Sequence, residues 1–417
     1  WQHNAARVLP EKQRIDDRVA ELFVPVILII SLLTFFIWVF FGGIDVVSHG
    51  LFAALSVLVV ACPCAVGLAT PVALAAGLNK AARNHILIRD TSALEQMRNV
   101  DVVVFDKTGT LTEGHPTVIG WLWAQGQEEH YKDVLLAAES TSDHPLAEAI
   151  VTALEGEEQV IPAHLDGFEN ITGKGVRVAY QGAEYWVGSH KLLKDYQANL
   201  SDILADMLTQ YESDGNSIVY FGRENDLLAV IAIKDQLRVT SMEAIRELRI
   251  QDVEICMLTG DGERTASSVA GSLGIMRFVA DAMPDDKEDF IHKLQLQGKT
   301  VAMVGDGVND ARALSCADVS IAMGKGTDTL MDTAMITLRT SDLLLLPKVF
   351  RLSRQTVSLM YRNLFWAFIY NTVGIFVAAG VLYPVYDILL SPALAGAVMA
   401  LSCVSVALSS LRLSSRF

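Results

Sequence analysis

A carboxylate follows an apolar, β-branched run in the first third of the chain, and its neighbours suit phosphate chemistry. The run is Val102 to Phe105, and Asp106 comes directly after it. Such a run predicts a buried parallel strand, so Asp106 should lie at the carboxyl end, where open α/β sheets bind their ligands. The next residues, Lys107-Thr108-Gly109-Thr110, add a cation, hydroxyl groups and a glycine that lets backbone amides approach a phosphate. This setting favours a nucleophile over a turn-forming Asp.

Three further short motifs follow along the chain. They are Thr259-Gly260-Asp261, Pro284-Asp285-Asp286-Lys287 and Gly305-Asp306-Gly307-Val308-Asn309-Asp310. Phosphoryl transfer needs a nucleophile, a hydroxyl and amide cradle for the phosphate, a neutralising cation and carboxylates that hold Mg²⁺. One motif alone would be weak, because Gly-Asp-Gly is usually a turn. Together with Asp106, however, the motifs supply every part of one phosphoryl-transfer site.

The order of these motifs resembles that of the haloacid-dehalogenase-like superfamily. The segment from Asp106 to Thr110 resembles the phosphorylation motif of its P-type ATPase branch, the ion pumps that form an aspartyl phosphate. The resemblance implies that ATP phosphorylates Asp106 and that Thr259 and Lys287 contact the phosphate. It also implies which residues are catalytic, namely Asp106, Lys107, Thr108, Thr259, Gly260, Asp261 and Lys287. The residues implied to bind Mg²⁺ are Asp106, Thr108, Asp306 and Asp310.

One position separates a pump from a phosphatase. Phosphatases of this superfamily typically carry a second Asp two residues after the nucleophile, where it acts as general acid and base. This chain has Thr108 there. Without that base, water attacks a phospho-aspartate slowly, so the intermediate should persist long enough to drive a conformational change.

Composition indicates a membrane part joined to a soluble part. Of the 417 residues, 51% are hydrophobic and 19% are charged, and the mean hydropathy is +0.34, which is more apolar than an ordinary soluble protein. Uncharged runs cover residues 22–44, 51–78, 364–386 and 388–411. Each reaches the ~20 residues that a helix needs to cross a bilayer core of ~30 Å. The sequence therefore predicts four transmembrane helices in the lipid bilayer.

Lysine and arginine lie on one side of these runs. They occur before the first run, after the second, before the third and after the fourth, whereas the connections at 45–50 and 387 contain neither. We therefore expect an integral, multi-pass protein of the plasma membrane with both termini of the chain and residues 80–360 in the cytoplasm. A net charge of −15 argues against a nucleic-acid partner. The five cysteines have no repeating spacing, which favours a reduced cytosolic face over a disulfide framework.

The soluble region shows two patterns. Over residues 87–114 and 234–345, strand-like runs alternate with helical stretches, which is typical of a doubly wound parallel sheet. Between 115 and 233, helical stretches are followed by short alternating runs typical of an antiparallel sheet. We predict an α-helical transmembrane bundle plus cytoplasmic α/β: a haloacid-dehalogenase-like phosphorylation domain interrupted by an inserted α+β nucleotide-binding domain. The lead-in is then 1–21, and the helix pairs are 22–86 and 346–417.

The inserted domain contains Glu139, His144-Pro145, and Gly173-Lys174-Gly175 followed by Val187-Gly188. Each feature is common by itself, because His144 could simply begin a helix and Gly-Lys-Gly often forms a hairpin turn. As a set they resemble the nucleotide-binding domain of the heavy-metal P-type ATPases. The resemblance implies that Glu139 and His144 contact adenine and that Gly173 and Gly175 let the backbone approach ATP.

Cys62-Pro63-Cys64 lies in the middle of the second uncharged run. On a regular helix, residues i and i+2 point about 200° apart, so two thiols at this spacing share an ion only where the helix opens. Pro63 removes a backbone donor and disrupts the preceding turn, and such irregular backbone is tolerated at membrane depth where it lines a site. The alternative is that both Cys are small buried apolar residues. The intervening proline favours ligands.

Cys-Pro-Cys shortly before a phosphorylation motif resembles the ion site of the heavy-metal pumps. Copper and silver members also carry Tyr-Asn in the next helix and Met with following Ser residues in the last one. The third and fourth runs lack the Lys and Asp of zinc and cadmium members, and thiolate and thioether ligands suit Cu(I). The resemblance implies a site for Cu(I) or Ag(I) at Cys62, Cys64, Tyr370, Asn371, Met399 and Ser402. Cys403 replaces a Ser of the family, and we favour a packing role for it.

These observations favour ATP-driven export of Cu(I) through phospho-Asp106, with ATP and Mg²⁺ as cofactors and a cytosolic copper donor as partner. A zinc or cadmium pump is the nearest alternative. A membrane-anchored phosphatase and a non-enzymatic metal sensor are alternatives of other classes, and a sensor leaves the phosphoryl-transfer residues unexplained. Copper pumps also have further N-terminal helices, an actuator domain with Thr-Gly-Glu and usually a soluble Cys-x-x-Cys domain. This sequence contains none of these motifs, so we expect it to be part of a longer protein.

Overall fold

The computed structural model describes residues 11–42, 47–62, 64–124, 128–142, 144–157, 160–198, 202–306, 310–324 and 334–415. These residues form two compact units. The first contains the described residues up to Asn84, Asp90–Arg98 and those from Phe350 on, and the second contains His85–Arg89 and Asn99–Val349.

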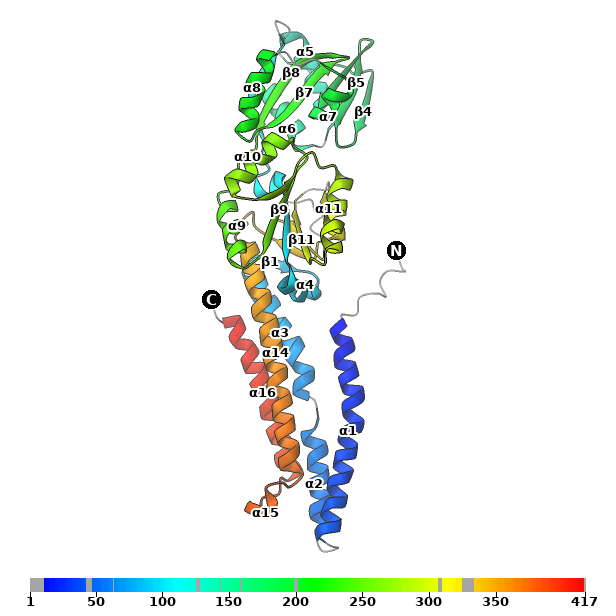
Figure 1. Cartoon of the computed structure of the whole chain (residues 1–417), viewed down its shortest axis with the longest axis vertical. Coiled ribbons are helices and arrows are strands. Elements are labelled where there is room, and N and C mark those ends of the chain that lie inside the picture. The colour runs from blue at the N-terminus through cyan, green and yellow to red at the C-terminus, as the bar shows by residue number, and fades with distance from the viewer. Residues whose placement is uncertain are drawn as a thin grey trace. The chain divides into compact units, whose positions relative to one another are not determined.

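The first unit is built of long helices (Figure 1). They are α1 (Glu11–Gly42), α2 (Val47–Val60), α3 (Cys64–Arg83), α14 (Leu345–Ala378, which begins in the second unit) and α16 (Pro392–Ser415), with the short α4 (Thr91–Gln96), η2 (Met97–Asn99) and α15 (Tyr383–Tyr386). Leu28, Ile29 and Phe36 of α1 are each more than half exposed, as expected of side chains that face lipid. Three segments of the described chain are long and apolar enough to cross a membrane: Val24–Phe41, Val47–Arg83 and Pro392–Leu413.

The third predicted helix, over residues 364–386, ends earlier than expected. Helix α14 ends at Ala378, and the chain turns at Gly380, where φ is +94°. The turn packs against Trp38, whose indole Nε1 donates a hydrogen bond to the Ala379 carbonyl at 3.0 Å. Helix α14 is not among the three segments above. Its uncharged part begins after Arg362 and ends with the helix at Ala378.

The second predicted span is interrupted where proline was expected to open it. Helix α2 ends at Val60 and α3 begins at Cys64, while Pro63 lies outside the described residues. The Cys62 amide donates to the Val59 carbonyl at 3.3 Å, in place of a regular helical bond.

The second unit contains a seven-stranded sheet in the order β1-β13-β12-β11-β2-β9-β10. All neighbouring strands are parallel except β1 and β13, so the predicted doubly wound parallel sheet is confirmed. The strands are β1 (Ile86–Ile88), β2 (Val102–Asp106), β9 (Glu254–Leu258), β10 (Arg277–Val279), β11 (Val301–Gly305), β12 (Val319–Met323) and β13 (Ile336–Leu338). The associated helices are α9 (Ser241–Ile250), α10 (Glu263–Leu273), α11 (Pro284–Leu296) and α12 (Ala311–Cys316).

A second, six-stranded antiparallel sheet has the order β3-β8-β7-β6-β5-β4. Its strands are β3 (Thr117–Trp123), β4 (Gly167–Ile171), β5 (Gly175–Tyr180), β6 (Ala183–Gly188), β7 (Ser217–Arg223) and β8 (Asp226–Lys234). Its helices are α5 (Glu128–Glu139), α6 (Pro145–Glu155), α7 (His190–Asp195) and α8 (Asp202–Ser213). The α5 and α6 side packs around Leu135, Ile150 and Phe221, and the α7 and α8 side packs around Trp186 and Tyr220. The alternating runs that we identified in the sequence did not include β3 and β4.

Candidate active site and ion site

Asp106 lies at the carboxyl end of the central strand β2 and is 7% exposed. Strand β2 pairs with β9 on one side and β11 on the other, and since all three are parallel, their carboxyl ends meet at one edge. The first turn of α11 brings Lys287 to this edge. Its Nζ donates to Asp106 Oδ1 at 2.6 Å and to Asp310 Oδ1 at 2.8 Å.

Three carboxylates converge at this edge. Asp106, Asp306 and Asp310 each offer one oxygen, and these atoms lie within 4.8 Å of one another. Burial raises the pKa of Asp306 and of Asp310 to about 7, and the charge of Asp106 adds to the effect. Oxygen ligands of this kind suit Mg²⁺, and a divalent cation among them would offset their mutual repulsion. The donor set therefore fits a magnesium site.

Two lysines of the site form ion pairs with different carboxylates. Although burial opposes it, Asp106 and Asp310 hold the pKa of Lys287 above its usual range. Lys107 instead forms an ion pair with the Asp261 carboxylate and donates to Ser217 Oγ at 3.0 Å. Burial disfavours a charged Asp261, yet Lys107 lowers its pKa below the usual range. The cation beside the nucleophile is therefore Lys287 and not its sequence neighbour.

The end of β9 continues into Thr259-Gly260-Asp261. Thr259 Oγ1 donates to Asp261 Oδ2 at 3.0 Å and accepts from the Asp261 backbone amide at 3.1 Å. Gly260 lies between them, and an added Cβ there would lie 3.7 Å from the Ala282 carbonyl oxygen. The hydroxyl and the carboxylate of this motif are thus held together beside the Lys107 ammonium.

The loop after Asp106 passes close to Asp306. Thr108 has extended backbone there (φ −75°, ψ 130°), and Gly109 has a φ of +71°. A Cβ at Gly109 would collide with the Asp306 carboxylate. Glycine is therefore required by both the backbone conformation and the close approach. Gly307, Val308 and Asn309 lie outside the described residues.

Sequence reasoning missed two residues that hold this loop. Arg238 Nε donates to the Thr110 carbonyl at 3.0 Å, and its Nη2 donates to the Gly109 carbonyl. Asp235 accepts from Thr112 Oγ1 at 2.5 Å and from the Gly114 amide at 3.1 Å. Asp235 follows β8 directly and Arg238 lies three residues further on, where the chain returns from the antiparallel sheet. Two charged residues at that return were the available signal.

The predicted adenine contacts come from α5 and α6. Glu139 ends α5 and is 6% exposed, and burial raises its pKa to about 7. His144 caps α6 through Nδ1, which accepts the Leu146 amide at 3.2 Å. His144 is exposed to solvent. Desolvation by the surrounding protein nevertheless lowers its pKa, while the charge of Asp261 opposes the shift.

The glycines of the antiparallel sheet allow close backbone approach. Gly173 has a φ of +70°, and a Cβ there would lie 2.8 Å from Met283 Cε. Gly175 has a φ of +145°, and its Cβ would collide with the Val187 carbonyl. Glycine is therefore required at both positions by the positive φ and by the close approach of neighbouring protein atoms.

Two apolar layers hold the helices of the first unit together. One contains Val57 and Val60 of α2 with Ala378 and Ala395, and the other contains Ala65, Val66, Ala69, Ala367 and Val406. In sequence, the breakpoint at Cys62 and Cys64, Asn371 of α14, and Met399 and Ser402 of α16 all fall between these layers.

Polar atoms in this intervening zone have no protein partner. Both amide atoms of Asn371 and the hydroxyl of Ser402 are buried and make no hydrogen bond among the described residues. A buried polar atom without a partner is costly, and such atoms commonly mark a ligand or water site. Tyr370 is not brought into the interior, because its side chain is 41% exposed and packs beside Trp366. Cys403 is partly buried against the layer that contains Ala65.

The expectation that the cysteines form no disulfide is wrong for one pair. Cys62 and Cys64 are joined by a disulfide, with their Cα atoms 5.5 Å apart. The cause is the broken helix, which turns both sulfur atoms to the same side where a regular helix would separate them. The same geometry brings the two sulfurs to one point, as a shared ion requires, once the pair is reduced. Cys256, Cys316 and Cys403 are free.

Similarity to known proteins agrees with this geometry. Residues 100–318 match the haloacid dehalogenase-like hydrolase family. The chain is 42% identical over 401 residues to a copper-exporting P-type ATPase of Legionella pneumophila, covering 96% of this chain and 54% of the relative. It is 43% identical over 406 residues to a silver exporting P-type ATPase of Salmonella typhimurium, covering 97% of this chain and 49% of the relative.

A solved structure agrees as well. The crystal structure of a zinc-transporting PIB-type ATPase in the E2.Pi state superimposes with a TM-score of 0.68 at 32% identity, covering 95% of this chain and 63% of the other. The chain spans about half the length of the copper- and silver-exporting relatives described above. From its motifs, its two sheets and this similarity, the chain belongs to the heavy-metal-transporting P-type ATPases of the haloacid dehalogenase-like superfamily.

Proposed function

We propose that this chain is the catalytic and ion-conducting part of a pump that exports Cu(I), or Ag(I), with phospho-Asp106 as its intermediate. The observation that carries the proposal is the Lys287 ammonium, which bridges the carboxylates of Asp106 and Asp310 at 2.6 and 2.8 Å. A nucleophilic carboxylate neutralised by a buried cation next to further carboxylates is the arrangement that phosphoryl transfer requires.

In the proposed step, an Asp106 oxygen attacks the γ-phosphorus of ATP. A phosphorus–oxygen bond to Asp106 forms, the bond from the γ-phosphorus to the ADP oxygen breaks, and ADP leaves. Lys287 and the Thr259 hydroxyl neutralise and bind the transferred phosphate, while Lys107 and Asp261 position the motif around them. Mg²⁺, held by Asp106, Asp306, Asp310 and Thr108, would neutralise charge on the phosphates. The attack needs no proton transfer, because Asp106 reacts as a carboxylate.

The nucleotide would bind along the antiparallel sheet. Glu139 and the His144 ring contact adenine in this proposal, and Gly173 and Gly175 let the rest of ATP approach the protein backbone. Support comes from the positions of Glu139 and His144, which lie at the end of α5 and at the start of α6.

The transported ion would bind between the two apolar layers of the first unit. Reduced Cys62 and Cys64 and the Met399 thioether form a soft donor set, which favours Cu(I) over Zn²⁺. The unpartnered side-chain groups of Asn371 and Ser402 would lie beside these sulfur donors. Tyr370 would have to turn inward to join them. The copper and silver relatives support this choice, whereas the zinc-transporting structural relative supports the alternative. We further propose the plasma membrane as location, cytoplasmic termini and a cytosolic copper donor.

Phosphorylation from γ-labelled ATP tests the proposal. Asp106→Asn should abolish acid-stable labelling, because an amide cannot form the acyl phosphate, while nucleotide binding remains. The matched control is Asp101→Asn, at the exposed residue just before the same strand. Labelling that survives in Asp106→Asn would place the nucleophile elsewhere.

The same assay separates the alternatives. Labelling stimulated by Cu(I) and not by Zn²⁺ is expected of a copper pump. Stimulation by Zn²⁺ alone would instead favour a zinc or cadmium pump, and hydrolysis of phosphate monoesters without metal activation would favour a phosphatase.

A further inference from the structure

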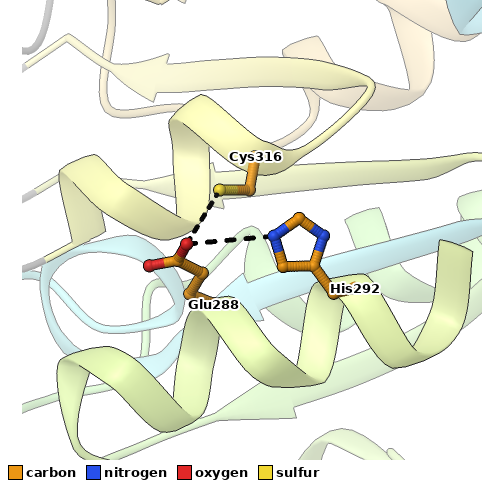
Figure 2. Close-up of side chains that lie close together, drawn as sticks. All are labelled: Glu288, His292 and Cys316. Atoms are coloured by element: carbon orange, nitrogen blue, oxygen red, sulfur yellow. Dashed lines mark hydrogen bonds and ion pairs between the residues drawn. The ribbon is translucent and has the colours of Figure 1, made fainter.

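A second group of metal-binding side chains lies outside the residues used so far. Glu288 and His292 are one turn apart on α11, and Cys316 ends α12. Figure 2 shows the three side chains converging between the two helices. One carboxylate oxygen, one ring nitrogen and one sulfur lie within 4.8 Å of one another.

Two of the three separations between these atoms are close to those of a tetrahedral metal site. Cys316 Sγ lies 3.5 Å from Glu288 Oε1, and His292 Nε2 lies 3.8 Å from the same oxygen. Zinc bonds of about 2.3 Å to sulfur and about 2.1 Å to nitrogen or oxygen put tetrahedral ligand atoms about 3.4 to 3.6 Å apart. Small side-chain adjustments would therefore bring all three atoms to an ion, with a fourth position left for water.

Gln295 orients the histidine for this purpose. Its Nε2 donates to the Cys316 carbonyl at 2.8 Å and also contacts Asp318 Oδ2 at 3.3 Å, which fixes the direction of the amide. Its Oε1 is then the acceptor 3.2 Å from His292 Nδ1. A neutral imidazole that donates through Nδ1 carries its lone pair on Nε2, the nitrogen that faces Glu288. Metal-binding histidines are commonly held in this way by a hydrogen bond to their second nitrogen.

We propose that Glu288, His292 and Cys316 form a binding site for a borderline divalent cation of the Zn²⁺ class. A thiolate, an imidazole and a carboxylate suit such an ion, whereas one thiolate with a carboxylate suits Cu(I) poorly. Binding displaces the Cys316 proton, which the sulfur otherwise donates to Glu288, so one proton is released per ion. The ion would join α11, which carries Lys287, to α12, which directly follows Asp310. The site itself does not depend on the proposed transport function.

The test uses the full chain in detergent, stripped of metal, with Cys62→Ser and Cys64→Ser introduced to remove the membrane thiols. Co²⁺ serves as a spectroscopic probe for Zn²⁺, because a thiolate ligand produces a charge-transfer absorption in the near ultraviolet. Excess Mg²⁺ occupies the Asp106 cluster, which contains no thiol. We expect one equivalent of Co²⁺ to generate this absorption and Zn²⁺ to abolish it.

Matched variants identify the ligands. Cys316→Ser should remove the absorption, whereas Cys403→Ser should retain it. His292→Ala should weaken Co²⁺ binding and the exposed His164→Ala should not. Gln295→Ala should keep the absorption but lower Co²⁺ affinity by about 10- to 100-fold, the usual effect of losing a hydrogen bond to a metal-bound histidine.

Circular dichroism establishes that each variant is folded. No absorption in the parent, or an absorption that survives in folded Cys316→Ser, would overturn the proposal and would leave the cluster as a thiol–carboxylate hydrogen bond. Equal Co²⁺ affinity in Gln295→Ala and the parent would overturn the orienting role of Gln295.

Discussion

At the edge of the parallel sheet, each of two buried lysines neutralises its own carboxylates. Lys287 holds Asp106 and Asp310, while Lys107 holds Asp261. Both ammonium groups are almost fully buried, as are Asp106 and Asp310. Removing one member of such an ion pair leaves an uncompensated buried charge. We therefore expect substitution of either lysine to be costly.

Lys287→Met should slow phosphorylation of Asp106 by roughly 10²- to 10³-fold, the usual effect of removing one group that stabilises transition-state charge. The reason is that Asp106, Asp310 and the incoming phosphate would lose their shared cation. Rapid-quench labelling from ATP measures the rate, and ATP binding should be retained. Lys293→Met, at an exposed position of the same helix, serves as control. Equal labelling rates in the two variants would contradict this role of Lys287.

The buried carboxyl group of Glu139 leads to a prediction of how the stability of the protein depends on pH. Burial raises its pKa from an ordinary 4.5 to about 7, so the native state binds the proton more tightly than the unfolded state. The associated stability is complete below pH 4.5 and is lost as the pH rises through 7. Glu139→Gln keeps a neutral group at every pH, so it should stabilise the protein at pH 8 by up to about 3 kcal/mol and have little effect at pH 4.

Thermal unfolding of the two proteins at pH 4 and pH 8 measures this difference. Glu148→Gln, an exposed change on α6, is the control. A shift of the same size at both pH values would mean that burial does not raise the pKa of Glu139 in the native state.

At the scale of secondary structure, close approach between strands shapes the nucleotide site. Strands β5 and β6 meet at Gly175 and Gly188, which are paired residues. A Cβ on Gly188 would collide with the Lys174 carbonyl oxygen, and the Ser189 amide donates to that same oxygen at 2.8 Å. The strand ends therefore tolerate no side chain at this point.

Gly188→Ala should accordingly destabilise the antiparallel sheet by about 1 to 3 kcal/mol, as other overpacking substitutions do. It should also raise the ATP concentration needed for half-maximal phosphorylation. Gly167→Ala on β4 is the control, because its Cβ would make only an ordinary 3.7 Å contact with Ala179, and we expect a change within ~0.5 kcal/mol. If Gly188→Ala unfolds at the same temperature as Gly167→Ala, the strand ends have more freedom than these contacts indicate.

Across the whole molecule, the proposed pump contains two sites of different chemistry, one in each compact unit. The phosphorylation site uses hard oxygen donors and ammonium groups, and the membrane zone offers soft sulfur donors beside unpartnered amide and hydroxyl groups. Thiolates bind metal and disulfides do not, so the redox state of Cys62 and Cys64 should control the second site.

Reduced protein should show Cu(I)-stimulated phosphorylation of Asp106, and oxidised protein should not. Cys62→Ser should remove the stimulation and yet retain labelling by inorganic phosphate, which requires no bound ion. Cys403→Ser, in the adjoining apolar layer, should respond to Cu(I) as the parent does. Copper activation that persists in both Cys62→Ser and Cys64→Ser would reduce the pair to packing residues.

Several features were predictable from the sequence because their causes are local. The β-branched run before Asp106 places it at a strand end, and short-range alternation predicts β5 to β8. Proline between Cys62 and Cys64 predicts the interrupted helix. The uncharged runs likewise predict membrane helices from composition alone, without knowledge of their neighbours.

Tertiary structure decided the rest, because side-chain direction depends on contacts between distant segments. Lys287 reaches Asp106 across 181 positions of sequence, whereas Lys107, the immediate neighbour of Asp106, faces Asp261. Arg238, which follows the last strand of the inserted domain in sequence, holds the loop after Asp106. Trp38 packs against the turn that follows α14. No local pattern encodes these contacts, since each requires that two separately formed elements pack before the side chains meet.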